Sequence, residues 1–123
     1  MKINESAENY LETILILSNK LPHVRSIDIV EELNFKKSSV SVAMKNLREK
    51  EHIVVTKDGF IQLTESGKLI AKTIYERHRF ISTWLMQIGV PEEISIQDAC
   101  KIEHVISKES FEAVKKFVKK HSK

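Results

Sequence analysis

Apolar side chains recur at intervals of three and four residues along most of this chain, and this period is typical of amphipathic helices. In the first such segment, Tyr10, Leu11 and Ile14 share an apolar side, while Asn9 and Glu12 lie on the polar side. The spacing therefore predicts a chain built mainly from helices. The expected helices cover residues 6–19, 27–33, 37–51, 65–88, a stretch that starts at Pro91, and residues 109–119.

Between the third and fourth of these helices, the pattern changes to two short β-prone runs, residues 53–56 and 60–63. The pair Asp58-Gly59 between the runs is typical of a tight hairpin turn. Just before this hairpin, the predicted helices 27–33 and 37–51 are joined by a brief turn, as in a helix-turn-helix. Together the two motifs predict a winged helix-turn-helix with a two-stranded β wing.

The predicted helix 65–88 is the longest, and its apolar residues exceed what one side of a small helix bundle needs. Thr64, directly before it, is a suitable N-cap residue. A second copy of the chain would cover the surplus apolar surface. We therefore expect a homodimer.

Length and composition restrict the class of protein. At 123 residues, of which 41% are hydrophobic, the chain is long enough for one sound core and too short for two large domains. Its apolar runs are short and broken by charge, so no membrane-spanning segment is expected. A single cysteine excludes an intrachain disulfide, and the N-terminus does not resemble a secretory or transit sequence. Both observations favour the reducing cytoplasm.

Basic charge is concentrated in residues 36–50, which hold five Lys or Arg residues and one acidic residue, although the whole chain has a formal charge of only +3. This segment contains the second helix of the helix-turn-helix, which enters the major groove of DNA in such motifs. Amines and short hydroxyls at its start suit phosphate oxygens and base edges, and Val42 offers an apolar contact to thymine methyl groups. The candidate DNA contacts are Lys36, Lys37, Ser38, Ser39, Ser41, Val42, Lys45 and, at the tip of the wing, Lys57.

A simpler interpretation of this segment stays open. Lys45, Arg48 and Lys50 can merely solvate an exposed helix face, and Ser38 and Ser39 can be helix caps. In addition, the first turn and a half of the helix contains no Arg, Asn or Gln for bidentate pairing with guanine or adenine. Phosphate contacts and DNA shape are therefore expected to carry much of the discrimination.

Cys100, Glu103 and His104 form the most distinctive chemical pattern of the chain. On a helix, their spacing places the three side chains within an arc of roughly 100°. A thiolate, a carboxylate and an imidazole together suit Fe²⁺, Co²⁺, Zn²⁺ or Mn²⁺ rather than Ca²⁺. The alternative is a buried cysteine beside a solvated Glu-His pair, since a free cysteine is usually a small core residue.

These motifs occur together with seven segments that match one known family, namely ENYLE at residues 8–12, VRSIDI at 24–29, SSVS at 38–41, LTESG at 63–67, RHR at 77–79, IGV at 88–90 and CKIEH at 100–104. Over essentially its whole length the chain closely resembles the DtxR/MntR family of metal-dependent transcriptional repressors, in the two-domain form without a C-terminal SH3-like domain. The resemblance implies a mainly α fold. A winged helix-turn-helix DNA-binding domain would cover residues 1–64, and an α-helical metal-binding and dimerisation domain would cover residues 65–123.

The resemblance also implies a set of metal ligands, which are Asn9, Glu12, His78, Cys100, Glu103 and His104. Cys100 is typical of the iron-type members, whereas Glu12 and the lack of a third domain are typical of the manganese type. Asn9 takes the place of Met in the iron type and of Asp in the manganese type. Two ancillary ligand positions of the iron type fall on Ser82 and Ile96. We therefore expect Fe²⁺ as the first choice of metal and Mn²⁺ as a close second.

The function implied by the resemblance is that of a repressor that binds double-stranded operator DNA with the metal as corepressor and controls metal-homeostasis genes. Arg25, in the matching segment 24–29, joins the expected DNA contacts. One alternative is a metal-independent winged-helix regulator that senses redox state through Cys100. Another is a hydrolase that uses Cys100 and His104, although adjacent turns of one helix leave no evident oxyanion pocket. His78 can also be a satisfied helix histidine near a dimer surface, and the winged helix can serve protein contacts alone.

Overall fold

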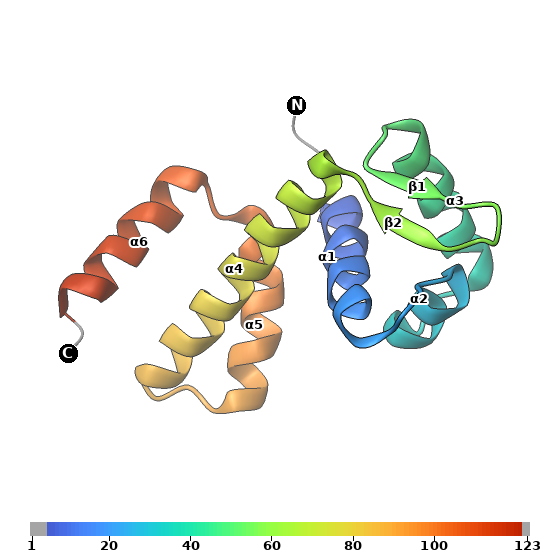
Figure 1. The fold of residues 1–123 in the computed structure, drawn as a ribbon. Coiled ribbons are helices and arrows are strands. Elements are labelled where there is room, and N and C mark those ends of the chain that lie inside the picture. The colour runs from blue at the N-terminus through green and yellow to red at the C-terminus, as the bar shows by residue number, and fades with distance from the viewer. Residues whose placement is uncertain (1–4, 122–123) are drawn as a thin grey trace. The chain divides into compact units, whose positions relative to one another are not determined.

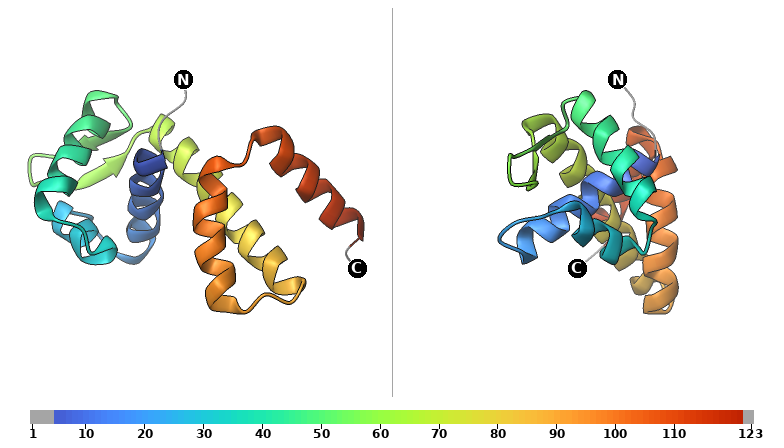
Figure 2. Two further views of the ribbon diagram at one scale, coloured as in Figure 1. Left: turned by 180° about the vertical axis from the view of Figure 1, so that it is seen from behind. Right: turned by 90° about the vertical axis from the view of Figure 1, so that its right-hand side faces the viewer.

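The computed structural model describes residues 5–121, in which three helices come first, a two-stranded antiparallel sheet follows, and three more helices complete the order (Figure 1). The expected mainly α fold with a two-stranded wing is confirmed. The chain divides into two compact units between Lys72 and Thr73, within α4 (Figure 2). The elements are α1 (Glu5–Lys20), α2 (Ser26–Leu33), α3 (Lys37–Glu49), β1 (Ile53–Val55), β2 (Ile61–Leu63), α4 (Glu65–Gln87), α5 (Glu92–Val105) and α6 (Lys108–His121).

A single cluster of buried apolar side chains holds the first unit together. The helices α1, α2 and α3 and both strands contribute to it, because each element presents one apolar side to the same interior. Burying one such aliphatic side chain contributes about 1.5–3 kcal/mol. The cluster consists of Tyr10, Leu11, Ile14, Leu17, Val24, Ile29, Val40, Met44, Leu47, Ile53, Ile61 and Ala71.

The turn between α2 and α3 depends on Asn34. This residue ends α2 with a φ of 56°, the left-handed conformation that Asn adopts more readily than most residues. The next helix, α3, turns Val40, Met44 and Leu47 toward the core. Its opposite side is consequently left exposed, which is the arrangement that a recognition helix requires.

The wing is an antiparallel hairpin in which Ile53 pairs with Leu63 and Val55 pairs with Ile61. Its turn is closed by Thr56, whose carbonyl accepts a hydrogen bond of 2.9 Å from the amide of Gly59. Gly59 has a φ of 84°, a conformation that the Asp-Gly sequence provides at little cost. Lys57 therefore lies at the exposed tip of the wing, as predicted.

Hydrogen bonds connect the start of α4 to the wing. Thr64 Oγ1 accepts a hydrogen bond of 3.2 Å from the amide of Gly67, so the predicted N-cap role of Thr64 is confirmed. The carbonyl of His52 accepts a hydrogen bond of 3.1 Å from the Thr64 amide. A Cβ atom at Gly67 would lie 2.0 Å from that same carbonyl oxygen, so only glycine fits there.

The second unit consists of the later part of α4, α5 and α6, and its apolar core is small. Ile81, Ala99 and Phe111 are its buried members. The rings of Phe80 and Phe111 meet edge to face, with their centroids 5.6 Å apart. Within residues 5–121, every helix is too short or too polar to span a bilayer.

Candidate metal centre and DNA-facing surface

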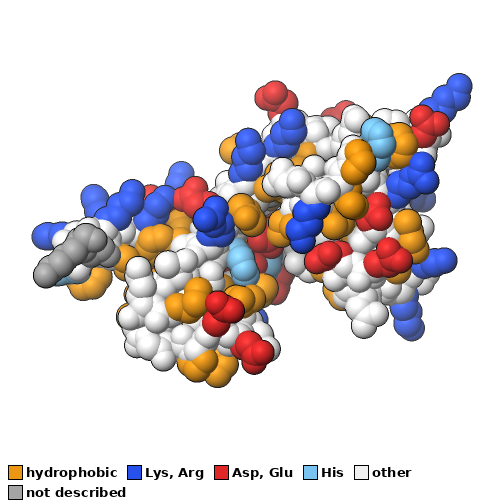
Figure 3. All heavy atoms as spheres, turned by 60° about the horizontal axis from the view of Figure 1, so that its bottom comes forward, with side chains coloured by type: hydrophobic (Ala, Val, Ile, Leu, Met, Phe, Trp, Pro, Cys, Tyr) orange, Lys and Arg blue, Asp and Glu red, His pale blue; other side chains and the backbone are white. Residues whose placement is uncertain are grey.

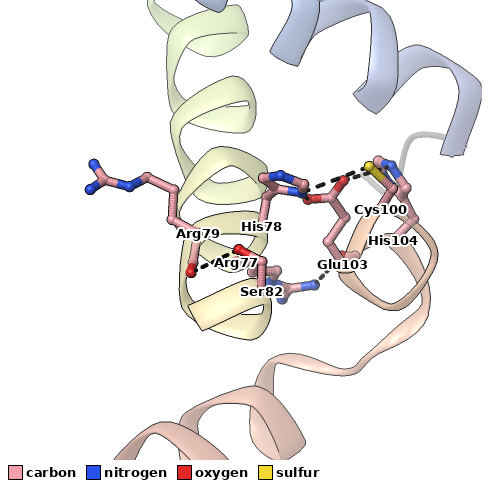
Figure 4. A network of polar contacts seen from close by, with 7 residues as sticks. All are labelled: Arg77, His78, Arg79, Ser82, Cys100, Glu103 and His104. Carbon is pink, nitrogen blue, oxygen red and sulfur yellow. Dashed lines mark hydrogen bonds and ion pairs between the residues drawn. The ribbon is translucent and has the colours of Figure 1, made fainter. Parts of the chain in front are cut away.

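The packing of α4 against α5 brings three candidate ligands together. One ligand atom each of His78, Cys100 and Glu103 lies within 4.8 Å of the others. Nδ1 of His78 lies 3.8 Å from Sγ of Cys100 and 3.4 Å from Oε2 of Glu103. Figure 4 shows the imidazole and the carboxylate pointing toward each other, with the thiol beside them.

Glu103 is the buried centre of this group, with only 1% of its surface exposed. Its Oε1 lies 3.5 Å from Nε2 of His104 on the next residue of α5. Within the part of the chain that the structure describes, its buried Oε2 has no hydrogen-bond partner. A buried carboxylate is costly unless a cation or a donor faces it, and here the imidazole of His78 faces Oε2 at 3.4 Å. The chemistry of the group therefore suits a bound cation.

The protonation of His78 follows from its neighbours. The close contacts with the Cys100 thiol and then with the Glu103 carboxylate raise the pKa of His78 from 6.5 to about 10, although burial acts in the opposite direction. Near neutral pH the imidazole consequently carries a proton. A divalent ion would replace that proton, because only the neutral ring nitrogen can bind a metal.

The donor atoms of the cluster fit a divalent transition metal. They comprise a sulfur, an imidazole nitrogen and a carboxylate oxygen, and Cys100 is exposed, which leaves a path from solvent. The other two predicted ligands, Asn9 and Glu12, lie on α1 in the first unit, and their part in the site stays a prediction.

The two positions at which iron-type ligands are replaced hold other side chains. Ser82 Oγ donates a hydrogen bond of 3.2 Å to the carbonyl of Arg79 on its own helix. Ile96 is 43% exposed and has no donor atom in its side chain. Neither residue adds a strong ligand to the cluster.

Arg77 also contacts this centre, although no pattern in the sequence identified it as a site residue. It precedes His78 on α4, and its Nη1 donates hydrogen bonds to the carbonyls of Glu103 and Ile106 at the end of α5. No motif marks such a contact, because the acceptors are backbone atoms. The match of residues 77–79 to the family was the only signal that could have drawn attention to it.

The predicted DNA contacts all have exposed side chains. Those on α3 lie outside the buried stripe of Val40, Met44 and Leu47, and Val42 is 60% exposed. Arg25 lies just before α2, where its guanidinium carbon is 4.8 Å from the ring centroid of Phe60. The nine exposed residues are Arg25, Lys36, Lys37, Ser38, Ser39, Ser41, Val42, Lys45 and Lys57.

A second group of basic side chains lies on α6. Figure 3 shows Lys and Arg side chains gathered in a row near the C-terminal end of the chain. The helix carries Lys108, Lys115, Lys116, Lys119 and Lys120. One of these, Lys115, forms an ion pair with Glu76 of α4, so part of the positive charge of α6 is neutralised within the second unit.

Family models match both parts of the chain. Residues 2–60 match the model described as the N-terminal DNA binding domain of the iron dependent repressor. Residues 64–123 match the model described as the iron dependent repressor, metal binding and dimerisation domain. The two models together account for nearly the whole chain.

Two relatives illustrate the similarity of sequence. An uncharacterized HTH-type transcriptional regulator of Methanocaldococcus jannaschii is 33% identical over 121 residues, which is 96% of each chain. The HTH-type transcriptional regulator MntR of Bacillus subtilis is 34% identical over 109 residues, which is 89% of this chain and 77% of the relative.

Two solved structures illustrate the similarity of fold. The manganese regulator SloR has a TM-score of 0.82 at 27% identity, and IdeR of T. acidophilum has a TM-score of 0.77 at 28% identity. The matches cover 97% and 95% of this chain, respectively, but 55% of each solved chain. This chain thus spans about half the length of those two proteins.

Proposed function

Because this chain belongs to the iron-dependent repressor (DtxR/MntR) family and is a metal-dependent transcriptional repressor, we propose that Fe²⁺ or Mn²⁺ is its corepressor, with Fe²⁺ preferred. The proposed ligands are His78, Cys100, Glu103 and His104, completed by Asn9 and Glu12 of α1. The observation that carries this proposal is the buried Glu103 carboxylate, whose Oε2 faces an imidazole and lies in reach of a thiol.

The preference for Fe²⁺ rests on the thiol of Cys100. A thiolate favours softer and later metals than a carboxylate does, and the amide oxygen of Asn9 is a weaker ligand than a carboxylate. The manganese regulator SloR, a structure at 27% identity, favours Mn²⁺ instead. A direct comparison of the two ions is therefore the decisive test of this part of the proposal.

The proposed partner is double-stranded operator DNA, bound by a homodimer in the cytoplasm. The exposed side of α3 would enter the major groove, and Lys57 would reach a neighbouring phosphate. We place the DNA-binding domain at residues 1–64 and the metal-binding and dimerisation domain at residues 65–123. The relatives are named as transcriptional regulators, which are not enzymes.

The residues of the chain have distinct tasks in this mechanism. Bound metal would supply the positive charge that Glu103 and the Cys100 thiolate need, in place of the proton on His78. Ligands on α1 as well as on α5 would make metal binding and the placement of the DNA-binding domain depend on each other. Operator DNA must then tighten metal binding by the same factor by which metal tightens DNA binding.

The experiment that tests this function is a titration of operator DNA with the protein in the presence of Mn²⁺, anaerobic Fe²⁺, Co²⁺ or Zn²⁺, with a chelated control. We expect DNA binding to be strong with metal and weak after chelation. Equal binding in all five conditions would contradict the proposal. The redox alternative has a separate test, which measures the responses of Cys100→Ser to peroxide and to metal. If Cys100 is a redox sensor, the substitution should abolish the response to peroxide. If Cys100 is a metal ligand, the substitution should weaken the response to metal.

A further inference from the structure

We infer that Arg77 is a positioning residue of the metal site, because its guanidinium holds the end of α5 at the distance from α4 that His78 and Glu103 require. Arg77 itself contributes no ligand atom. The inference rests on the proposed metal site and adds to it the residue that sets its geometry.

The contacts of Arg77 are concentrated on one short stretch of backbone. Its Nη1 donates to the carbonyl of Glu103 at 3.1 Å and to the carbonyl of Ile106 at 3.0 Å. α5 ends at Val105, so these carbonyls belong to the last turn of the helix and to the residue beyond it. Carbonyls at a helix C-terminus lack partners within the helix and attract positive charge. A guanidinium satisfies both requirements at once.

Arg77 and His78 are consecutive residues that contact the same residue of α5. His78 faces the carboxylate of Glu103, with Nδ1 and Oε2 3.4 Å apart, while Arg77 binds the backbone carbonyl of Glu103. Figure 4 shows the two side chains reaching α5 from one turn of α4. Both the backbone and the side chain of Glu103 are thus held by adjacent positions of α4. A displacement of the Glu103 backbone would alter the triangle of His78, Cys100 and Glu103.

The surroundings of Arg77 argue against a purely stabilising role. Its Nε is buried and, within the described residues, has no hydrogen-bond partner, which is unfavourable for a charged group. Its guanidinium carbon lies 5.4 Å from the ring centroid of Phe111 on α6. An apolar side chain would fill such a position without an unpaired donor. Arg77 leaves that donor unpaired while its Nη1 binds two carbonyls at the end of α5, so its contacts serve the position of this backbone.

The test compares Arg77→Met with Arg79→Met in Co²⁺ binding by the full chain. Arg79 is a matched control, because it lies two residues away, carries the same charge, packs over Tyr75 and points away from the cluster (Figure 4). We expect R77M to bind Co²⁺ roughly 10–100-fold more weakly, as when a side chain that orients a metal ligand is removed. The thiolate-to-cobalt absorption band should also shift, and amides at the end of α5 should exchange faster in the metal-free protein.

The outcomes separate this inference from the proposed function. If R77M keeps the parental Co²⁺ affinity and absorption band, the positioning role is wrong even where thermal stability falls. If R77M does not fold, Arg77→Gln decides in the same way, since it keeps a polar side chain but removes the charge that faces the end of α5. If the parent chain binds no Co²⁺, the proposed function and this inference both fall, whereas parental binding with an unchanged R77M overturns the inference alone.

Discussion

The two units of this chain are stabilised by different means. Among the described residues, the first unit has one cluster of twelve buried apolar residues, whereas the second has Ile81, Ala99 and Phe111. The second unit relies more on polar contacts, among them those of Arg77 and Glu103 with the elements beside them. The first unit should therefore stay folded without a ligand, while the stability of the second unit should depend on bound metal.

Replacement of Glu103 by Gln should remove most of the response to metal. The substitution keeps the size of the side chain but takes away the buried negative charge that faces His78. We expect the affinity for Mn²⁺ or Fe²⁺ to fall by more than the roughly 10–100-fold that loss of a ligand-orienting side chain costs. Isothermal titration calorimetry measures this change. Glu109→Gln, on the exposed start of α6, serves as the control, and equal metal affinities for the two variants would refute the assignment.

Truncation of the core of the first unit should affect stability and leave the metal site intact. Ile29 is fully buried on α2, so Ile29→Ala should lower the free energy of unfolding by about 2–5 kcal/mol. Chemical denaturation followed by circular dichroism measures this loss. The folded variant should still bind Co²⁺ with parental affinity. A large drop in Co²⁺ affinity would contradict this prediction and would show that the core of the first unit also supports the ligands proposed on α1.

Metal affinity should rise with pH. Because the pKa of His78 is raised to about 10, the metal-free imidazole is protonated at neutral pH, and a metal must displace that proton. Displacement of one proton raises the affinity about tenfold per pH unit below that pKa. Titrations with Mn²⁺ between pH 6 and 8 check this slope, and His78→Gln should bind more weakly with a flatter dependence.

The same shift predicts the opposite trend for the stability of the metal-free protein. The folded pKa of His78 lies above its unfolded value of 6.5, so the stabilising effect of the charged imidazole is complete below that value. It is lost as the pH rises toward about 10. Metal-free protein should therefore lose stability across this range relative to His78→Gln, as measured by denaturant titration at each pH.

The smallest effect is expected at single lysines. Lys45 is exposed on α3, and Lys45→Ala should make the salt dependence of operator binding shallower by about one unit of slope, the contribution of one phosphate contact. Lys119→Ala on α6 is the matched control, because it removes the same charge outside the predicted DNA contacts. Equal changes for both variants would mean that net charge, and not the exposed side of α3, governs binding.

Local features of the fold could be predicted from the sequence to a large extent. The Asp58-Gly59 turn, the Thr64 cap and the helices lie where short-range patterns placed them, with ends that differ by one or two residues. Such features depend on neighbouring residues, so the sequence contains their cause. Helix ends are less well determined, because the last residues of α6 gain little from packing.

The candidate site could be predicted only in part. The spacing of Cys100, Glu103 and His104 suggested a shared arc, but only the resemblance to a family added His78, which lies 22 residues earlier. Periodicity does not reveal which turn of α4 packs on which turn of α5. Arg77 illustrates the limit most clearly, since its acceptors are backbone carbonyls 26 and 29 residues away. Every residue has the same backbone carbonyl, so the residue types do not reveal which carbonyl accepts a hydrogen bond.

The close approach of Gly67 to His52 has a consequence for protein engineering. A chimera that joins the wing of this chain to the long helix of another protein must keep glycine at this position, because a Cβ atom there would lie 2.0 Å from the His52 carbonyl oxygen. The junction should therefore fall after Gly67, so that the wing and the first turn of α4 are transplanted as one piece. The position of this junction therefore decides whether DNA-binding domains can be exchanged between repressors of this kind.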